Sequence, residues 1–328
     1  MLRRLALSAL LLTAVVALPR ASAARASVHA AAMTNVSFSL NWLTNVEFAS
    51  IWVAQQKGYW KQAGLNVTAE PINFSTPPEV KVGTGKFMFG FEDGAAIVIA
   101  RGNGIPIKAI WPEGQQSPFA FATMPKSGIT TVKEFKGKRI GYQEHEKYVL
   151  ETMLNHAGMT LADVTPQLVQ FDPIVLLTGK VDASLVYISN EPIQIAQKDH
   201  INVNIIPASK YGYDFYSDVL FTADSTIKSN PALVRKVVSV LDRGWRYAIA
   251  HPTETARIVV PVLDKTDSVA QQTDEMRALT SLSSTPQAAL GSMTAAKWQY
   301  GINLLAKYKQ IKSAFPASDA FTTQFLPR

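Results

Sequence analysis

The sequence predicts a two-lobed α/β fold in which each lobe is a mostly parallel sheet with covering helices. Residues 36–67 have the pattern of strand, polar loop, helix, tight turn and strand, because apolar and polar positions alternate first and helical spacing follows. Strands and helices then alternate through two similar stretches of the chain. An extended segment near 119–124 has no helix before it, and a second near 216–222 returns; both are predicted to cross between the lobes.

The first lobe is predicted to contain residues 34–118 and 223–328. After the opening unit, helices are expected at 77–83 and 94–101 and strands at 87–91 and 107–111. Asn230-Pro231 begins a helix, since proline suits the first helical position. Its apolar spacing runs to His251-Pro252, and three further helices are expected at 255–263, 269–282 and 294–307.

The second lobe, residues 125–215, repeats the alternation. Helices are expected at 132–135, 147–156, 173–178 and 192–198, and strands at 138–142, 167–171, 183–187 and 203–207. Two segments that cross between the lobes form a hinge, and hinged lobes close on a ligand.

Residues 1–23 are predicted to be a cleavable export signal. Arg3-Arg4 precede an apolar run and the small residues Ala21-Ser22-Ala23. The run is too short for a spanning helix. The chain has no cysteine, which excludes disulfides, thiolate metal sites, a cysteine nucleophile and a lipid-modified N-terminal cysteine. We therefore expect a periplasmic protein without a lipid anchor.

The charge of the chain gives no indication of nucleic-acid binding. The formal charge is +7, and removing the three arginines of residues 1–23 leaves +4. The basic residues are interspersed with acids and form no run with interleaved aromatics.

The candidate ligand-binding residues follow the predicted strands, where open α/β sheets bind their ligands. In the first lobe they are Asn41, Trp42, Asn45, Glu92, Asp93 and Trp111. In the second lobe they are Gln143, Glu144, Phe171, Tyr187, Asn190 and Glu191.

These residues are predicted to bind a neutral or cationic nitrogen heterocycle. Carboxylates accept hydrogen bonds from ring N–H and amino groups, whereas they repel an incoming anion. Trp42 and Trp111 offer faces for stacking, although aromatic residues also fill cores. Glu144 could equally stabilise the start of the helix that follows it, and Glu191 could cap the helix that begins at residue 192.

Catalysis finds little support in the sequence. The five histidines are scattered without metal-ligand spacing, and nucleophile-elbow, phosphate-loop and dinucleotide motifs are missing. We expect no catalytic residue, metal or cofactor.

Several motifs, in order along the chain, make it similar to one known family. The opening N-W-x-x-N-x-E-F-A leads into x-V-A-x-x-K-G-Y-W-K-x-A-G-L-x-V, which ends at Val67. Further matches are Gly137 to Tyr142, Gly179 to Ala183, Asn190-Glu-Pro192, Tyr213 to Phe221, Asn230-Pro231, Gly244-Trp245 and His251-Pro252. Together they resemble the substrate-binding proteins of ABC importers, in the branch that binds thiamine-pyrimidine precursors, riboflavin, sulfonates and nitrate.

The resemblance implies a type II periplasmic binding protein, expected to be a monomer, that captures a small molecule for the permease and ATPase subunits of an ABC importer. A hydroxymethyl- or formylamino-pyrimidine, or riboflavin, is the favoured ligand. The first alternative is an alkanesulfonate, nitrate or similar anion. The second is an enzyme, since one related group makes the thiamine pyrimidine from its own histidine and pyridoxal phosphate. That group carries a cysteine-rich motif, which this chain lacks.

Overall fold

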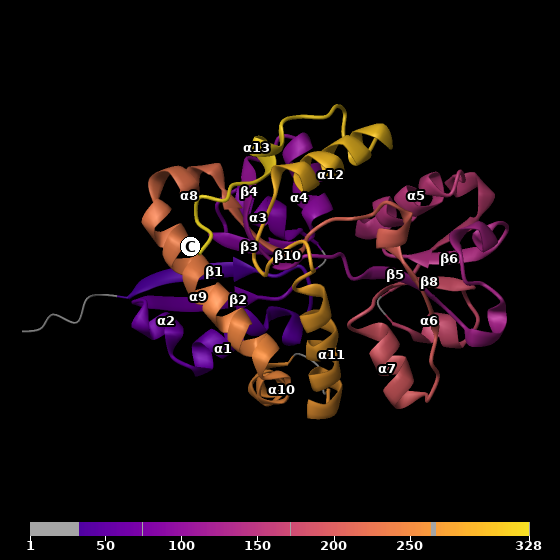
Figure 1. The fold of residues 1–328 in the computed structure, drawn as a ribbon, viewed down its shortest axis with the longest axis horizontal. Coiled ribbons are helices and arrows are strands. Elements are labelled where there is room, and N and C mark those ends of the chain that lie inside the picture. The colour runs from indigo at the N-terminus through magenta and orange to yellow at the C-terminus, as the bar shows by residue number, and fades with distance from the viewer. Residues whose placement is uncertain (1–32, 74, 171, 264–266, 328) are drawn as a thin grey trace, which may run out of the picture. The chain divides into compact units, whose positions relative to one another are not determined.

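The computed structural model describes residues 33–73, 75–170, 172–263 and 267–327. These residues contain two five-stranded sheets (Figure 1). The predicted signal, residues 1–23, and the candidate Phe171 lie outside the described residues.

The first sheet has the strand order β2-β1-β3-β10-β4. Its strands are β1 (Thr34–Ser39), β2 (Leu65–Glu70), β3 (Phe89–Glu92), β4 (Ile107–Gly114) and β10 (Ser217–Ala223). β1 pairs in parallel with β2 and β3, whereas β10 is antiparallel to both of its neighbours. One reversed strand therefore lies between strands that share a direction.

The second sheet repeats this arrangement in the order β7-β6-β8-β5-β9. Its strands are β5 (Phe119–Thr123), β6 (Arg139–Tyr142), β7 (Thr165–Leu168), β8 (Ala183–Tyr187) and β9 (Asn204–Pro207). Here β5 is the strand that runs against its neighbours. The predicted two-lobed α/β fold is confirmed, with one antiparallel strand in each mostly parallel sheet.

The segments predicted to cross between lobes coincide with β5 and β10, which are paired within the sheets. The chain passes from one sheet to the other through residues 115–118 and again through residues 212–216. The lobe boundaries and the hinge stay a prediction.

Helices cover both faces of the first sheet (Figure 1). One face packs against α1 (Ala49–Gln56), α9 (Pro231–Ala250) and α10 (Pro252–Val259). The other packs against α3 (Pro78–Gly83), α4 (Gly94–Gly102), α12 (Ala295–Lys307) and α13 (Ala317–Ala320). The helix predicted after β1 breaks at Gly58, whose φ of 70° separates α1 from α2 (Tyr59–Gln62).

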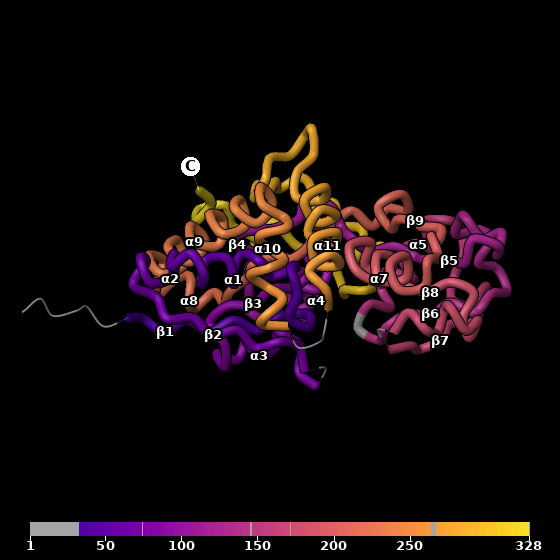
Figure 2. Tube along the Cα trace, turned by 90° about the horizontal axis from the view of Figure 1, so that it is seen from below, coloured from indigo at the N-terminus to yellow at the C-terminus, as the bar shows by residue number. Residues whose placement is uncertain are grey.

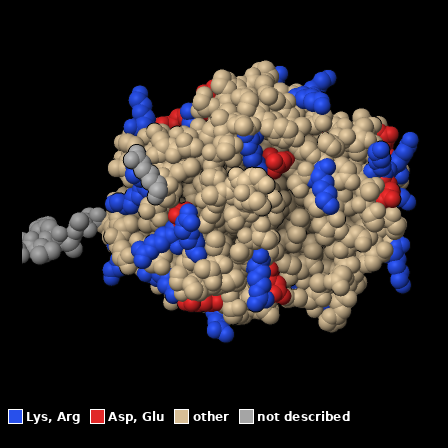
Figure 3. Space-filling model, viewed as in Figure 1, with Lys and Arg blue, Asp and Glu red and all other residues tan. Residues whose placement is uncertain are grey.

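The second sheet is accompanied by α5 (Lys147–His156), α6 (Ile174–Leu177) and α7 (Glu191–Lys198). α7 lies beside α11 (Val269–Leu282), and the Gln197 side-chain amide donates to the Asp274 carboxylate over 2.8 Å (Figure 2). The remaining helix is α8 (Asp224–Ser229), and short 3-10 turns include η1 (Val46–Phe48), η4 (Glu144–Glu146) and η6 (Ala208–Tyr211). Figure 3 shows lysine and arginine at scattered positions on the visible face.

Candidate functional site

A cavity lies where the carboxyl ends of strands from both sheets meet. Residues after β1, β3, β6 and β8 contribute to it, as the strand-end rule predicts. The lining residues are Asn41, Trp42, Glu47, Glu92, Asp93, Phe119, Gln143, Glu146, Tyr148, Leu185, Val186, Tyr187, Asn190 and Glu191.

Asp93 is fixed in the wall of this cavity by two hydrogen bonds. It is the N-cap of α4, and its Oδ1 accepts from the Ala95 backbone N–H at 2.8 Å. The same oxygen accepts from the Tyr213 hydroxyl at 2.7 Å, which ties the cap to the segment between the sheets. Oδ2 is buried and has no hydrogen-bond partner among the described residues. Burial raises the pKa of Asp93 to about 7.

Two glutamates add carboxyl groups beside Asp93. Glu92 ends β3, and its Oε1 accepts from the Asp93 backbone N–H at 3.0 Å. Burial, reinforced by the charge of Glu79, raises the pKa of Glu92 well above its usual value. Burial also raises the pKa of Glu146, on η4, to about 7. Burial therefore favours the neutral form of Glu92 in the ligand-free protein, while Glu146 is partly ionised near neutrality.

Glu191 and Glu47 enter the cavity from opposite sides. Glu191 is the first residue of α7, and its Oε2 accepts from the Tyr187 backbone N–H at 2.8 Å. Glu47 lies on η1, where the N-cap Asn45 accepts from the Glu47 backbone N–H at 2.8 Å. The pKa of Glu47 is raised well above normal by burial and by Asp218.

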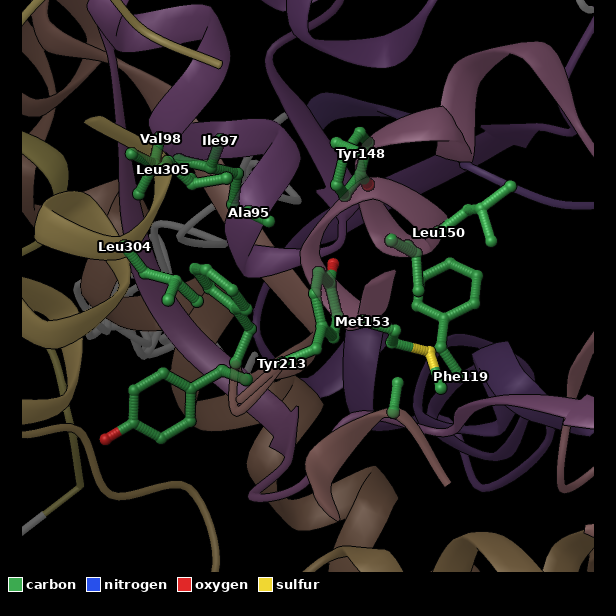
Figure 4. Packing of buried hydrophobic residues seen from close by; sticks show 14 of the residues in the cluster. Ala95, Ile97, Val98, Phe119, Tyr148, Leu150, Met153, Tyr213, Leu304 and Leu305 are labelled. Atoms are coloured by element: carbon green, nitrogen blue, oxygen red, sulfur yellow. The ribbon is translucent and has the colours of Figure 1, made fainter. Parts of the chain in front are cut away.

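Aromatic rings form the apolar part of the wall. Phe119 at the start of β5 meets Tyr187 edge to face, with ring centroids 4.7 Å apart. Tyr148 on α5 stacks on Tyr213 with centroids 6.1 Å apart, and Figure 4 shows Phe119, Tyr148 and Tyr213 in one buried cluster. Trp42 is half-buried and packs against the core of the first lobe. The cavity thus combines flat apolar surfaces with carboxyl groups.

Some candidate residues lie elsewhere. Trp111 is fully buried in the core, because β4 continues to Gly114 and helices cover both faces of the sheet, so Trp111 lies within a strand and not at its end. Glu144 is exposed and lines a neighbouring hollow, and Asn45 holds the start of η1 beside another. The remaining described candidates line the cavity: Asn41, Trp42, Glu92, Asp93, Gln143, Tyr187, Asn190 and Glu191.

Sequence reasoning missed several lining residues. Glu146 and Tyr148 follow the predicted strand 138–142, and the turn of η4 brings Glu146 into the wall while Glu144 stays exposed. A search for acidic residues through the first helical turn, instead of only at the strand end, would have found Glu146. Phe119, Leu185 and Val186 lie on strands, where the apolar pattern indicates only core packing.

Burial of Asp93 predicts a pH-dependent effect of the variant Asp93→Asn on folding. The folded carboxyl has a pKa of about 7, against about 3.9 in an unfolded chain, so the unfolded state loses its proton first as the pH rises. The contribution of Asp93 to the free energy of unfolding of the wild type is therefore present at low pH, and it is lost as the pH rises from about 4 to about 7. We expect Asp93→Asn to gain stability relative to wild type across this range in urea unfolding at each pH.

Asp199→Asn is the control for this measurement, because Asp199 is exposed at the end of α7. The stability of Asp199→Asn over the same pH range is the reference for that of Asp93→Asn. A stability difference between Asp93→Asn and wild type that is constant from about pH 4 to pH 8 would contradict the raised pKa.

The described part of the chain provides no helix of the length and apolarity needed to cross a membrane. Within the same residues, no group of three or more histidine, aspartate or glutamate side chains is arranged to hold a metal ion.

Three comparisons place the chain among known proteins. The riboflavin-binding protein RibY of Chloroflexus aurantiacus is 25% identical over 307 residues, which cover 90% of this chain and 87% of RibY. The 4-amino-5-hydroxymethyl-2-methylpyrimidine phosphate synthase of Aspergillus parasiticus is 26% identical over 66% of this chain and 67% of its own length. The alkanesulfonate-binding protein SsuA of Xanthomonas axonopodis, solved with MOPS, has a TM-score of 0.68 at 16% identity, covering 90% of this chain and all of SsuA.

The structural match to SsuA shows the fold alone, which is that of a periplasmic binding protein. Together with RibY, it confirms the resemblance to the substrate-binding proteins of ABC importers. The family model described as "NMT1/THI5 like" matches residues 45–255, so the chain belongs to the NMT1/THI5-like family.

Proposed function

We propose that this chain is the monomeric, periplasmic solute-binding component of an ABC importer, and that it captures a nitrogen heterocycle between its lobes. The ligand is a neutral or cationic ring with amino or N–H donors. In this proposal the loaded protein delivers the ligand to the permease and ATPase subunits, and residues 1–23 direct export.

The charge of the cavity wall carries this proposal. Among the described residues that line the cavity, five are acidic and none is lysine, arginine or histidine. An anion bound there would oppose ionisation of these carboxyl groups and would be repelled by those that are ionised, in a partly desolvated site where charges are screened less than in water. Unpaired acceptors in the wall, Asp93 Oδ2, Glu146 Oε2 and Asn41 Oδ1, instead suit a ligand that donates hydrogen bonds.

Hydrogen bonds and ring stacking of the kind proposed have about the free energy that micromolar binding requires. A charge-assisted hydrogen bond contributes about 1.5–3 kcal/mol, and an aromatic stack about 0.5–1.5 kcal/mol beyond area burial. A micromolar dissociation constant corresponds to about −8 kcal/mol. Two hydrogen bonds, a stack on Trp42 and the apolar area buried against Phe119 or Tyr187 approach this value once ordering costs are deducted.

The arrangement of the site suits either a single ring or a larger ring system. A second hollow adjoins the cavity and shares Asn41, Glu92, Glu146 and Tyr148 with it. In this proposal an aminopyrimidine occupies the cavity alone, and a flavin also extends into the hollow. The names of the relatives support both, since RibY is named for riboflavin and the synthase for an aminopyrimidine.

An anion such as an alkanesulfonate is the alternative ligand, which the fold of SsuA would allow. Anion sites require N–H donors or positive charge, commonly at a helix N-terminus. In this cavity the starts of α4 and α7 carry Asp93 and Glu191. The carboxyl groups at these helix starts argue against an anion.

The enzyme alternative comes from the similarity to pyrimidine phosphate synthases. A Schiff base with pyridoxal phosphate requires a lysine, and a histidine donor requires an imidazole near it. The described residues that line the cavity include neither. We therefore propose binding without chemistry.

Isothermal titration with two sets of compounds tests the proposed function. The first set is 4-amino-5-hydroxymethyl-2-methylpyrimidine and riboflavin, and the second is taurine, sulfate and nitrate. We expect micromolar or tighter binding of a heterocycle and none of the anions at millimolar concentration, because the wall is acidic.

Tight binding of an anion, with no heterocycle bound, would overturn the proposed ligand class. Schiff-base absorbance after addition of pyridoxal phosphate would favour the enzyme instead. Asp199→Asn serves as the control variant, since its exposed carboxylate lies outside the lining residues.

A further inference from the structure

Behind the cavity wall lies a row of buried carboxyl groups on neighbouring strands. In the antiparallel register Val219 pairs with both Glu92 and Pro112, and Ser217 pairs with Gly114. Asp218, between these pairs, consequently lies beside Asp93 on one side and Glu113 on the other. Glu47 lies against the same row from η1, close enough for the charge of Asp218 to raise the pKa of Glu47. We call Glu47, Asp93, Glu113 and Asp218 the carboxyl row.

The carboxyl row is almost completely removed from solvent. The exposed fractions are 4% for Glu47, 2% for Asp93, 0% for Glu113 and 2% for Asp218. Both carboxyl oxygens of Glu113, Oδ1 of Asp218 and Oδ2 of Asp93 have no hydrogen-bond partner among the described residues. Buried acceptors without donors are costly, so the row contains more acceptor capacity than the surrounding protein satisfies.

The groups that face the row do not neutralise it. Ser50 and Ser217 lie next to Glu113 and Asp218, and the Tyr187 phenol faces from β8. Lys297 on α12 is a cation that influences Asp93. Its ammonium group is already bound to the Asp214 carboxylate at 2.6 Å and the Gln115 carbonyl at 2.8 Å. A positively charged ligand in the cavity would therefore offset negative charge on the carboxyl row that Lys297 does not offset.

We propose that the ligand of this cavity is a cation, and that the carboxyl row balances its charge from within and behind the wall. This inference rests on the proposed function and restricts its ligand class from neutral or cationic heterocycles to charged ones. Glu47 and Asp93 lie at the cavity itself, while Asp218 and Glu113 act through a desolvated interior, where charges interact over longer distances than in water.

The raised pKa values of the carboxyl row mean that a cationic ligand and protons would compete for the same groups. Burial raises the pKa of Asp218 to about 6 and of Asp93 to about 7, and raises those of Glu47 and Glu113 well above normal. The charge of Asp218 adds to the effect of burial on the pKa of Glu47, so these two carboxyl groups do not ionise independently. A bound cation favours the ionised forms, so protons from the row pass to solvent on binding.

A pair of ligands matched in shape tests the inference. The probes are 4-amino-5-hydroxymethyl-2-methylpyrimidine and its 5-aminomethyl analogue, which replaces the hydroxyl with an ammonium group. At about pH 7 we expect the aminomethyl compound to bind at least tenfold more tightly in isothermal titration. The ratio of the two affinities should shrink at about pH 5, where Asp93 and Asp218 are protonated while the ammonium group stays charged. Because the ammonium group lowers the basicity of the ring, the ring pKa of each compound is measured separately and the affinities are corrected for ring protonation.

Asp218→Asn tests the row without altering a residue that lines the cavity. Asp218 has a φ of 47°, which asparagine tolerates. We expect the preference for the aminomethyl compound over the hydroxymethyl compound to fall at least threefold. Glu113→Gln should also lower the preference for the aminomethyl compound. It replaces Asp218→Asn in the test if Asp218→Asn fails to fold. Asp199→Asn, with its exposed carboxylate, should leave the preference unchanged.

The outcomes separate the two proposals. If no heterocycle binds, the proposed function fails. If the hydroxymethyl compound binds as tightly as the aminomethyl compound, or if both row variants keep the full preference while folded, only the cation inference is overturned.

Discussion

Replacement of Trp42 with alanine is expected to weaken ligand binding at least a hundredfold, which corresponds to about 2.7 kcal/mol. Trp42 lines the cavity directly after β1, where its indole can cover one face of a bound ring. The loss combines an aromatic stack of about 0.5–1.5 kcal/mol with apolar area at about 25 cal/mol per Å². Titration of the heterocycle identified for the wild type measures the effect, with the melting temperature of the ligand-free variant recorded beside it.

Trp52→Ala is a matched control for this variant. Trp52 is also a half-buried tryptophan packed against the core of the first lobe, but it lies on α1 away from the cavity lining. We expect both variants to lose similar apo stability and only Trp42→Ala to lose affinity. Intact binding by Trp42→Ala would assign Trp42 to the core alone.

A large loss of stability is expected for Gly244→Ala. Alanine is normally the better helix former by about 1 kcal/mol, so at an open position of α9 this change would stabilise the protein. A Cβ at Gly244 would instead lie 2.3 Å from the Ser50 carbonyl oxygen, because α9 and α1 pack in close contact there. The obstacle is helix backbone, which cannot rotate away as a side chain can. We expect a net cost of at least about 2 kcal/mol in urea unfolding.

Ser239→Ala provides the comparison within the same helix, since Ser239 is exposed on α9. This variant should be neutral or slightly stabilised. A Gly244→Ala protein as stable as Ser239→Ala would show that α1 and α9 can move apart at little cost.

The strand-end argument predicted many of the residues that line the cavity, because it depends on local sequence. The alternating pattern that ends at Asn41-Trp42, and the polar residues after 87–91 and 183–187, fix where each strand stops. At β4 the argument was wrong for Trp111. The strand continues through Pro112-Glu113-Gly114. These residue types are uncommon in strands, so the sequence pattern predicted that the strand ends before its true end.

Pairing between strands distant in sequence could not be predicted. The segments 119–124 and 216–222 have the composition of strands, and local pattern alone gave no reason to insert each between other strands of a sheet. For the same reason, the juxtaposition of Asp93, Asp218 and Glu113 could not be foreseen. It arises from the antiparallel register of β10 with both β3 and β4.

The position of β10 also imposes an order on folding. The second sheet uses only strands from one continuous stretch, β5 to β9, so its pairing can be completed as soon as that stretch is available. The first sheet has a vacant place between β3 and β4 until residues 217–223 follow the whole of the second sheet along the chain. Closing that gap requires a long-range loop closure, the kind of step that slows folding. A folding chain would therefore hold an incomplete first sheet with exposed edges after the second sheet has formed, and during this interval it would be most exposed to aggregation and proteolysis.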